Sequence, residues 1–144
     1  MLTGNSLRVL DVAEFVDVEV LPALRAGDRI PSVVLHRTCS SAQLGLHPAL
    51  SRVATAVADE VVEPEDRGCC AFAGDRGLLH PELTASATAA ESSAVVQADG
   101  AAHASVKRTC ELAVTRATGR TYRHLLELLD DVTRPDPDRQ EPGR

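Results

Sequence analysis

Apolar residues recur along the chain in two spacings, one typical of helices and one typical of buried strands. Spacing of three or four residues occurs in five segments, so we expect helices over 10–24, 47–60, 81–98, 109–118 and 122–132. Short β-branched or apolar runs occur in three places, so we expect strands over 32–35, 61–63 and 102–106. Strands that alternate with helices predict an α/β fold, with a small parallel sheet of about three strands and flanking helices.

Breaker residues and composition set the expected limits of the domain. Pro48 suits the first turn of the second helix, and Gly100 and Gly119 suit helix ends. The last stretch is rich in Pro, Asp, Arg and Glu and offers little apolar surface to bury. We therefore expect one folded domain over 8–132 and a disordered tail over 133–144, of which 135–144 is dispensable for folding.

Length and charge narrow the function classes. A chain of 144 residues suits a single domain, and a net charge of -6 argues against a nucleic-acid surface. We expect no transmembrane segment, because no apolar run approaches about 18 residues. The first residues lack a basic region followed by an apolar run, so we expect a cytoplasmic protein. In that compartment, the four cysteines are expected to be thiols or metal ligands rather than disulfides.

The four cysteines each follow a predicted strand. Cys39 comes just after the first strand, Cys69 and Cys70 come after the second, and Cys110 comes after the third. The carboxyl ends of parallel strands meet at one edge of a sheet, where ligands bind in this class of fold. We therefore expect all four thiols to meet at the C-terminal strand edge.

The residues alone leave three interpretations of these cysteines open. Four thiolates can bind an iron–sulfur cluster, and four thiolates or a mixture of cysteine and histidine can bind zinc. Buried cysteines can also simply pack as small apolar residues. The adjacent pair Cys69 and Cys70 lies in a loop with Gly68 and Gly74, where both side chains can turn toward one ion. A thiol oxidoreductase based on this pair, or a nucleophile formed by Cys39 and His36, is supported only by proximity in sequence.

Several separated segments resemble one known family. They are HRTCSS at 36–41, GCCAFAGDRG at 68–77, HPELT at 80–84 and RTCE at 108–111. Together they resemble the cysteine-rich CCG domain of heterodisulfide reductases and of glycolate oxidase iron–sulfur subunits. They are most similar to the C-terminal end of FAD-linked D-lactate dehydrogenases that carry fused iron–sulfur domains. The resemblance extends over roughly residues 8 to 132.

The resemblance implies an electron-transfer role in the oxidation of a 2-hydroxy acid. It implies that Cys39, Cys69, Cys70 and Cys110 bind an iron–sulfur cluster of the 4Fe-4S type, or zinc as in some relatives. His36 would then donate to a cysteine sulfur or ligate zinc itself, although a histidine bonded to backbone is an equally good interpretation. FAD would be carried by a partner subunit or another domain, alongside further iron–sulfur domains, and any membrane association would be peripheral, through these partners.

Three departures from the family pattern limit this expectation. Ala71 replaces the glycine of the CCG motif, so we expect a turn that is compatible with a β-carbon. Lys107 stands where the reductase pattern has another cysteine, which leaves at most one four-ligand site. The chain has no ferredoxin cysteine run and no dinucleotide-binding fingerprint, so we expect no complete catalytic site in this chain alone. The alternative function is a zinc-binding structural or interaction module without a redox role.

Overall fold

The structure is a computed structural model that describes residues 7–25, 27–65 and 67–134. Its elements are α1 (Val12–Phe15), η1 (Val16–Val20), η2 (Leu21–Ala23), β1 (Ile30–Leu35), α2 (Cys39–Gln43), α3 (His47–Val57), β2 (Ala58–Val62), α4 (Arg76–Leu79), α5 (Pro81–Ala98), β3 (Ala102–Ser105), α6 (Arg108–Thr118), β4 (Tyr122–His124) and α7 (Leu125–Thr133).

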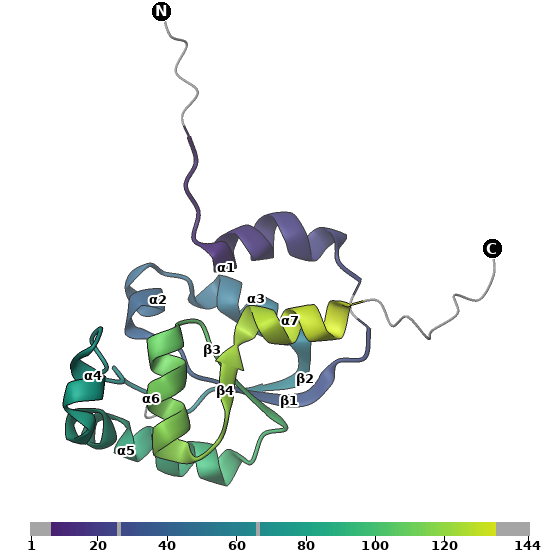
Figure 1. Cartoon of the computed structure of the whole chain (residues 1–144). Coiled ribbons are helices and arrows are strands. Elements are labelled where there is room, and N and C mark those ends of the chain that lie inside the picture. Colours follow the sequence, from purple (N-terminus) through teal and green to yellow (C-terminus); the bar gives the residue numbers. More distant parts are fainter. Residues whose placement is uncertain (1–6, 26, 66, 135–144) are drawn as a thin grey trace, which may run out of the picture.

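The strands form one parallel sheet in the order β2-β1-β3-β4, which confirms the predicted α/β fold (Figure 1). The sheet has a fourth strand where we expected the first turn of a helix over 122–132. Tyr122 pairs with His103 of β3, and the helix begins only at Leu125. The side chain of His124 accepts a hydrogen bond from the Leu126 N–H and so caps that helix.

Two other boundaries also differ from the sequence prediction. The helix expected over 47–60 ends at Val57, because Ala58 is extended and pairs with Ile30 of β1. Asp59 and Glu60 are therefore exposed on an edge strand, where charged side chains discourage pairing with another chain. The helix expected over 10–24 is present as three consecutive short helical segments, and its last segment contains Pro22.

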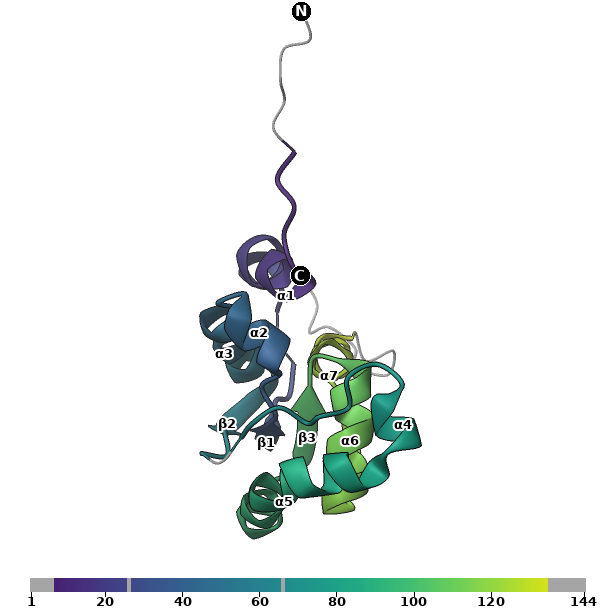
Figure 2. The same ribbon diagram turned by 90° about the vertical axis from the view of Figure 1, so that its left-hand side faces the viewer.

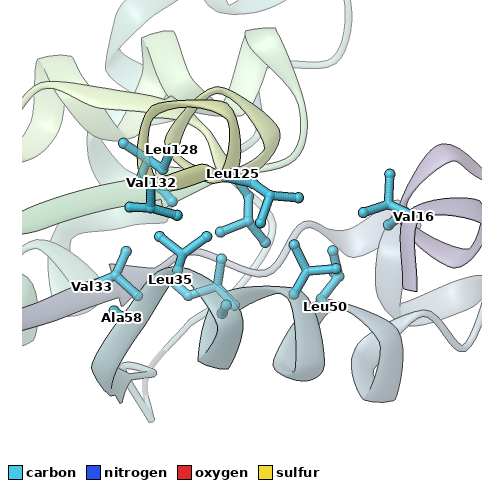
Figure 3. Packing of buried hydrophobic residues seen from close by; sticks show 14 of the residues in the cluster. Val16, Val33, Leu35, Leu50, Ala58, Leu125, Leu128 and Val132 are labelled. Atoms are coloured by element: carbon cyan, nitrogen blue, oxygen red, sulfur yellow. The ribbon is translucent and has the colours of Figure 1, made fainter. Parts of the chain in front are cut away.

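Helices cover both faces of the sheet (Figures 1 and 2). Val33 and Leu35 of β1 join a core built mainly with α3 and α7, against which α1 and η1 also pack (Figure 3). Val34 belongs to a separate core on the other face, together with residues of α5 and α6. All three β1 side chains are fully buried. Each such side chain contributes about 1.5–3 kcal/mol by leaving water, so the central strand is firmly held.

Two further expectations concern the start of the C-terminal tail and membrane-spanning helices. Helix α7 includes Thr133, the first residue of the predicted tail, while 135–144 lie outside the described residues. Among the residues that the structure describes, none of the helices combines the length and the apolar character needed to cross a membrane.

Candidate metal centre

The cysteines lie where three chain segments leave the sheet on its C-terminal side. Cys39 begins α2, whose N-terminus is capped by the Thr38 hydroxyl accepting from the Ser41 N–H. Cys69 and Cys70 lie in the loop between β2 and α4, and Cys110 lies in the first turn of α6. The parallel sheet thus brings together residues that are far apart in sequence.

Cys70 and Cys110 form the buried half of this group. Their Sγ atoms are 3.2 Å apart and share a hydrogen bond, although the residues are 40 positions apart in sequence. Only 4% of Cys70 and 3% of Cys110 is exposed, and both pack with Phe72 and Ala113. The apolar setting keeps water away from the two sulfurs.

Cys39 and Cys69 form the exposed half. Burial of the sulfur raises the pKa of the Cys39 thiol, and a hydrogen-bonding contact with Cys69 raises it further. The charge of Cys70 also acts on Cys39, and that of Cys39 acts on Cys110. The charges of Cys39 and Cys70 thus act between the exposed and the buried thiols, although the only close sulfur pair is Cys70 with Cys110.

The buried pair favours one thiolate at neutral pH. The hydrogen bond with Cys110 lowers the pKa of Cys70 to about 6, against the opposing effect of burial, and the Phe72 N–H contributes to the lowering. The same hydrogen bond, together with burial, raises the pKa of Cys110. Cys70 is thus prepared to act as an anionic ligand, since metals bind thiolates and not thiols.

The loop after Cys70 has an unusual backbone. Ala71, Ala73 and Gly74 all have positive φ, of 53°, 42° and 73°. We expected a turn at residue 71 that suits a β-carbon, and this expectation was wrong, because Ala71 is left-handed. The left-handed conformation costs an alanine about 1 kcal/mol or more. In exchange, it turns the chain so that the Phe72 N–H reaches the Cys70 sulfur while the Phe72 side chain is buried.

Gly77 closes the same loop. A β-carbon at this position would lie 2.6 Å from two atoms of the Phe72 ring and 2.9 Å from its Cα. The Gly77 N–H also donates to the Phe72 carbonyl oxygen over 2.7 Å. The motif glycine at 77 is therefore required by close packing of the loop that carries Cys69 and Cys70.

His36 lies at the end of β1 and is fully buried. Its Nδ1 is 2.6 Å from Oε1 of Glu91 on α5, a carboxylate that is itself only 2% exposed. The His36 ring therefore pairs with a side chain, and not with the backbone as the alternative interpretation expected. Sequence reasoning missed Glu91, although it is one of only two carboxylates in an Ala- and Ser-rich helix.

The other singled-out residues have mostly structural roles. His80 forms an exposed pair with Glu82, and Arg76, the first residue of α4, is also exposed. Glu111 is buried in the first turn of α6 and accepts from Arg108. Lys107 precedes that helix, and its charge works against the raised pKa of Cys110.

A hollow of about 210 Å³ adjoins the exposed thiols. Its lining includes Cys39, Cys69, His47, Arg37 and Arg67. Arg37 is held by Ser51 and Glu63, and the charge of Glu63 is shared with Arg67. The surface next to the exposed sulfurs is therefore polar and carries more than one cation.

Thiols are the right kind of ligand for a metal centre, but the four cysteines do not form one as they are arranged. Across the described residues, no three or more His, Cys, Asp and Glu side chains form a ready-made site for a single ion. Thiolates around tetrahedral zinc, each about 2.3 Å from the metal, lie about 3.8 Å from one another. Cys70 and Cys110 would have to separate to ligate a metal, and a cluster of several iron atoms would require a wider separation than zinc.

Comparison of the chain with protein-family models, with curated proteins and with solved structures found no match. What the chain does must therefore be argued from its own residues.

Proposed function

We propose that this chain is an iron–sulfur-binding electron-transfer domain. The observation that supports the proposal is the close pair of Cys70 and Cys110 at the C-terminal side of the sheet, with Cys39 and Cys69 on the connections that follow β1 and β2. Four thiolates are the usual ligand set of a 4Fe-4S cluster. The order and spacing of the cysteine segments, which resemble those of the CCG domain, favour this cofactor.

The division into buried and exposed thiols suits electron transfer. A bound cluster would supply a site that accepts and releases one electron at a time. Cys70 and Cys110 would hold it against an apolar wall, while Cys39 and Cys69 would face the solvent-accessible side. A redox partner could therefore approach the centre along the exposed pair.

The proposed partner carries the flavin. We propose that the chain serves an FAD-linked dehydrogenase of a 2-hydroxy acid, such as D-lactate, in the cytoplasm and beside other iron–sulfur domains. The flavin protein would remove two electrons from the substrate, and this chain would carry them onward. Support for this part comes from the resemblance of the segments at 36–41, 68–77 and 108–111.

Anaerobic reconstitution tests the proposal. The wild-type protein should take up about four iron and four sulfide per chain, with visible absorbance and a reversible one-electron step. Cys69→Ser, Cys70→Ser and Cys110→Ser should each lose most of that absorbance. Ala87→Ser, which adds a hydroxyl to an exposed position of α5, is the matched control and should behave as wild type. Equal cluster content in Cys69→Ser and wild type would contradict the proposal.

Zinc is the second candidate, and one observation favours it. A buried carboxylate bound to one histidine nitrogen, as Glu91 is to His36, is a common arrangement behind zinc ligands. In that case the chain would be a structural or interaction module. Metal analysis of the purified protein distinguishes the two candidates. A zinc site would give about one zinc per chain and no colour, whereas a cluster would give brown protein with iron and sulfide.

A further inference from the structure

Cys70 and Cys110 bring two sulfur atoms into direct contact. Their Sγ atoms are 3.2 Å apart, which is closer than the roughly 3.8 Å between two thiolates that bind one tetrahedral zinc. Neither residue is part of a disulfide, and both are buried in one cluster with Phe72 and Ala113. Two thiols held this close can be joined by a bond between their sulfurs.

The backbone on each side holds the two residues in place. Cys70 lies directly before the left-handed Ala71, in a loop that is closed by a hydrogen bond from the Gly77 N–H to the Phe72 carbonyl oxygen. Cys110 lies in the first turn of α6, which packs against α5. A disulfide requires its sulfurs at about 2.05 Å, so the pair has to close by about one ångström.

The burial of the pair determines which oxidant can reach it. Almost none of the surface of Cys70 or Cys110 is exposed, so a bulky disulfide has no approach to either sulfur. Hydrogen peroxide, the smallest hydroperoxide, needs little more room than water. A cysteine that peroxide has oxidised is protected from further oxidation when a second thiol lies beside it, as Cys110 lies beside Cys70.

We propose that Cys70 and Cys110 are a reversible redox pair, which hydrogen peroxide joins into a disulfide when no metal is bound to them. One sulfur attacks a peroxide oxygen, the O–O bond breaks, and a sulfenic acid and one water form. The second sulfur displaces the hydroxyl group as another water, and the S–S bond closes. Two thiols thus lose two hydrogen atoms, and one peroxide is reduced to two waters. A dithiol such as dithiothreitol opens the bond and is itself oxidised to a cyclic disulfide.

The disulfide and a bound metal exclude each other. Metals bind thiolates, and a sulfur that is part of a disulfide is not a thiolate. Oxidation therefore removes Cys70 and Cys110 from the proposed ligand set, while the exposed Cys39 and Cys69 remain thiols. Cytosolic disulfides are mostly transient and redox-sensing, and a bond that controls metal uptake would be of this kind. This exclusion rests on the proposed function, whereas formation of the disulfide does not.

Mild oxidation of the metal-free full chain tests the pair. Equimolar hydrogen peroxide should remove the mass of two hydrogen atoms from wild type without forming dimers. Trypsin cleaves after arginine, which places Cys110 in the peptide 109–116 and the adjacent cysteine pair in 68–76. These two peptides should be linked, and dithiothreitol should separate them. Any other main product would overturn the proposal, whether a dimer, a link between 38–52 and 68–76, or a chain that keeps four thiols.

Cysteine variants identify the sulfurs. Cys69→Ser, at an exposed position, is the matched control and should give as much linked peptide as wild type. Cys70→Ala should give none. Cys110→Ala removes the second sulfur, so Cys70 should gain oxygen instead of losing hydrogen. A link that is lost in Cys69→Ser, or one that survives in Cys70→Ala, would overturn the assignment.

Zinc uptake separates this proposal from the proposed function. The reduced chain should bind about one Zn²⁺, and the peroxide-treated chain should lose most of that uptake and regain it after dithiothreitol. Equal uptake by the reduced and the oxidised chain would overturn the exclusion. A reduced chain that takes up neither iron nor zinc would contradict the proposed function, while the peptide map still decides whether the disulfide forms.

Discussion

At the scale of single residues, backbone strain is concentrated beside the thiols. The left-handed residues Ala71, Ala73 and Gly74 lie within four positions of one another, directly after Cys70. Strained conformations persist where the surrounding structure over-determines them, and they cluster at functional sites. Here the burial of Phe72 and the close approach of Gly77 hold the loop in place.

Ala71→Gly should stabilise the protein. Glycine adopts positive φ without strain, although it also gains entropy in the unfolded chain, so we expect a net gain of about 0.5 kcal/mol in the free energy of unfolding. Urea denaturation measures it. Ala89→Gly, at an exposed position inside α5, is the control and should lose about 1 kcal/mol. A loss at residue 71 as large as that at residue 89 would contradict the strain argument.

The contact between Cys70 and Cys110 has a consequence for pH. In metal-free protein, one thiolate should form with a midpoint near pH 6, which the ultraviolet absorbance of thiolates measures. Because the pKa is lowered by the hydrogen bond with Cys110, Cys110→Ala should move the midpoint up, toward the ordinary thiol value of about 8.5. Cys39→Ala should leave a thiolate near pH 6. An absence of thiolate below pH 8 in the wild type would show that the pair does not act in this way.

At the scale of elements, one ion pair attaches the N-terminal helical segment to the body of the domain. Asp17 of η1 accepts two hydrogen bonds from the guanidinium of Arg52 on α3. The Asp17 carboxylate is almost fully buried, while half or more of the Arg52 side chain is exposed. Val16 of the same segment packs into the main core. The ion pair and the burial of Val16 therefore both hold η1 against the rest of the domain.

Asp17→Asn should destabilise the protein in a pH-dependent way. The hydrogen bonds from Arg52 lower the pKa of Asp17 in the folded protein below its ordinary value of 3.8. The stabilisation is therefore fully present above that value and is lost as the pH falls through the folded pKa. The urea midpoints of wild type and Asp17→Asn should differ by a constant amount between pH 7 and pH 5, and the difference should shrink below pH 3.8.

A surface pair provides the comparison for this prediction. Asp59 pairs with Arg29 but 60% of its side chain is exposed, so Asp59→Asn should change stability by less than about 1 kcal/mol at any pH. An effect of Asp17→Asn that is no larger than that of Asp59→Asn, or that grows as the pH falls below 3.8, would contradict the role given to Asp17.

Elements could be predicted from the sequence where one periodicity dominates. Val33, Val34 and Leu35 form a continuous apolar run, which is typical of a central parallel strand buried on both faces. β4 could not be predicted, because it has only three residues and Tyr122 fits the helical spacing of the leucines that follow. Its strand conformation depends on pairing with β3, and that contact is tertiary.

The candidate site could likewise be predicted from the sequence only in part. Of the four cysteines expected to meet, Cys70 and Cys110 lie in contact, as the convergence of strand ends in a parallel sheet predicts. Glu91 could not be predicted, since a carboxylate in an Ala-rich helix is ordinarily a solvated residue. Only the packing of α5 against the sheet shows that Glu91 faces His36.

At the scale of the whole molecule, the four thiols lie on the connections that follow three strands of the sheet. A metal bound there would link the segments after β1, β2 and β3, and ligands that bind only the folded state stabilise it. Zn²⁺ at about a thousand times its dissociation constant should add about 4 kcal/mol to the free energy of unfolding. Thermal unfolding with and without zinc measures this, and a chelator should reverse it.

Cys110→Ala is the variant that tests this effect. It removes one sulfur at little cost in volume, so it should fold but lose most of the zinc-induced rise in melting temperature. Ala87→Ser should keep the full rise. A rise of equal size in Cys110→Ala and wild type would place the zinc somewhere other than among the thiols.

The distance in sequence between the thiols also determines when a metal centre can be assembled. Cys70 and Cys110 are 40 positions apart, and α4, α5 and β3 lie between them. A nascent chain that has emerged only as far as α4 lacks Cys110, the last of the four proposed ligands, and its loops cannot close around a cofactor. Contacts of such long range form late, because the entropy of closing the intervening loop is lost before the contact repays it. Insertion of the proposed cofactor should therefore follow synthesis and collapse of the whole sheet. Metal uptake would then report that folding is complete.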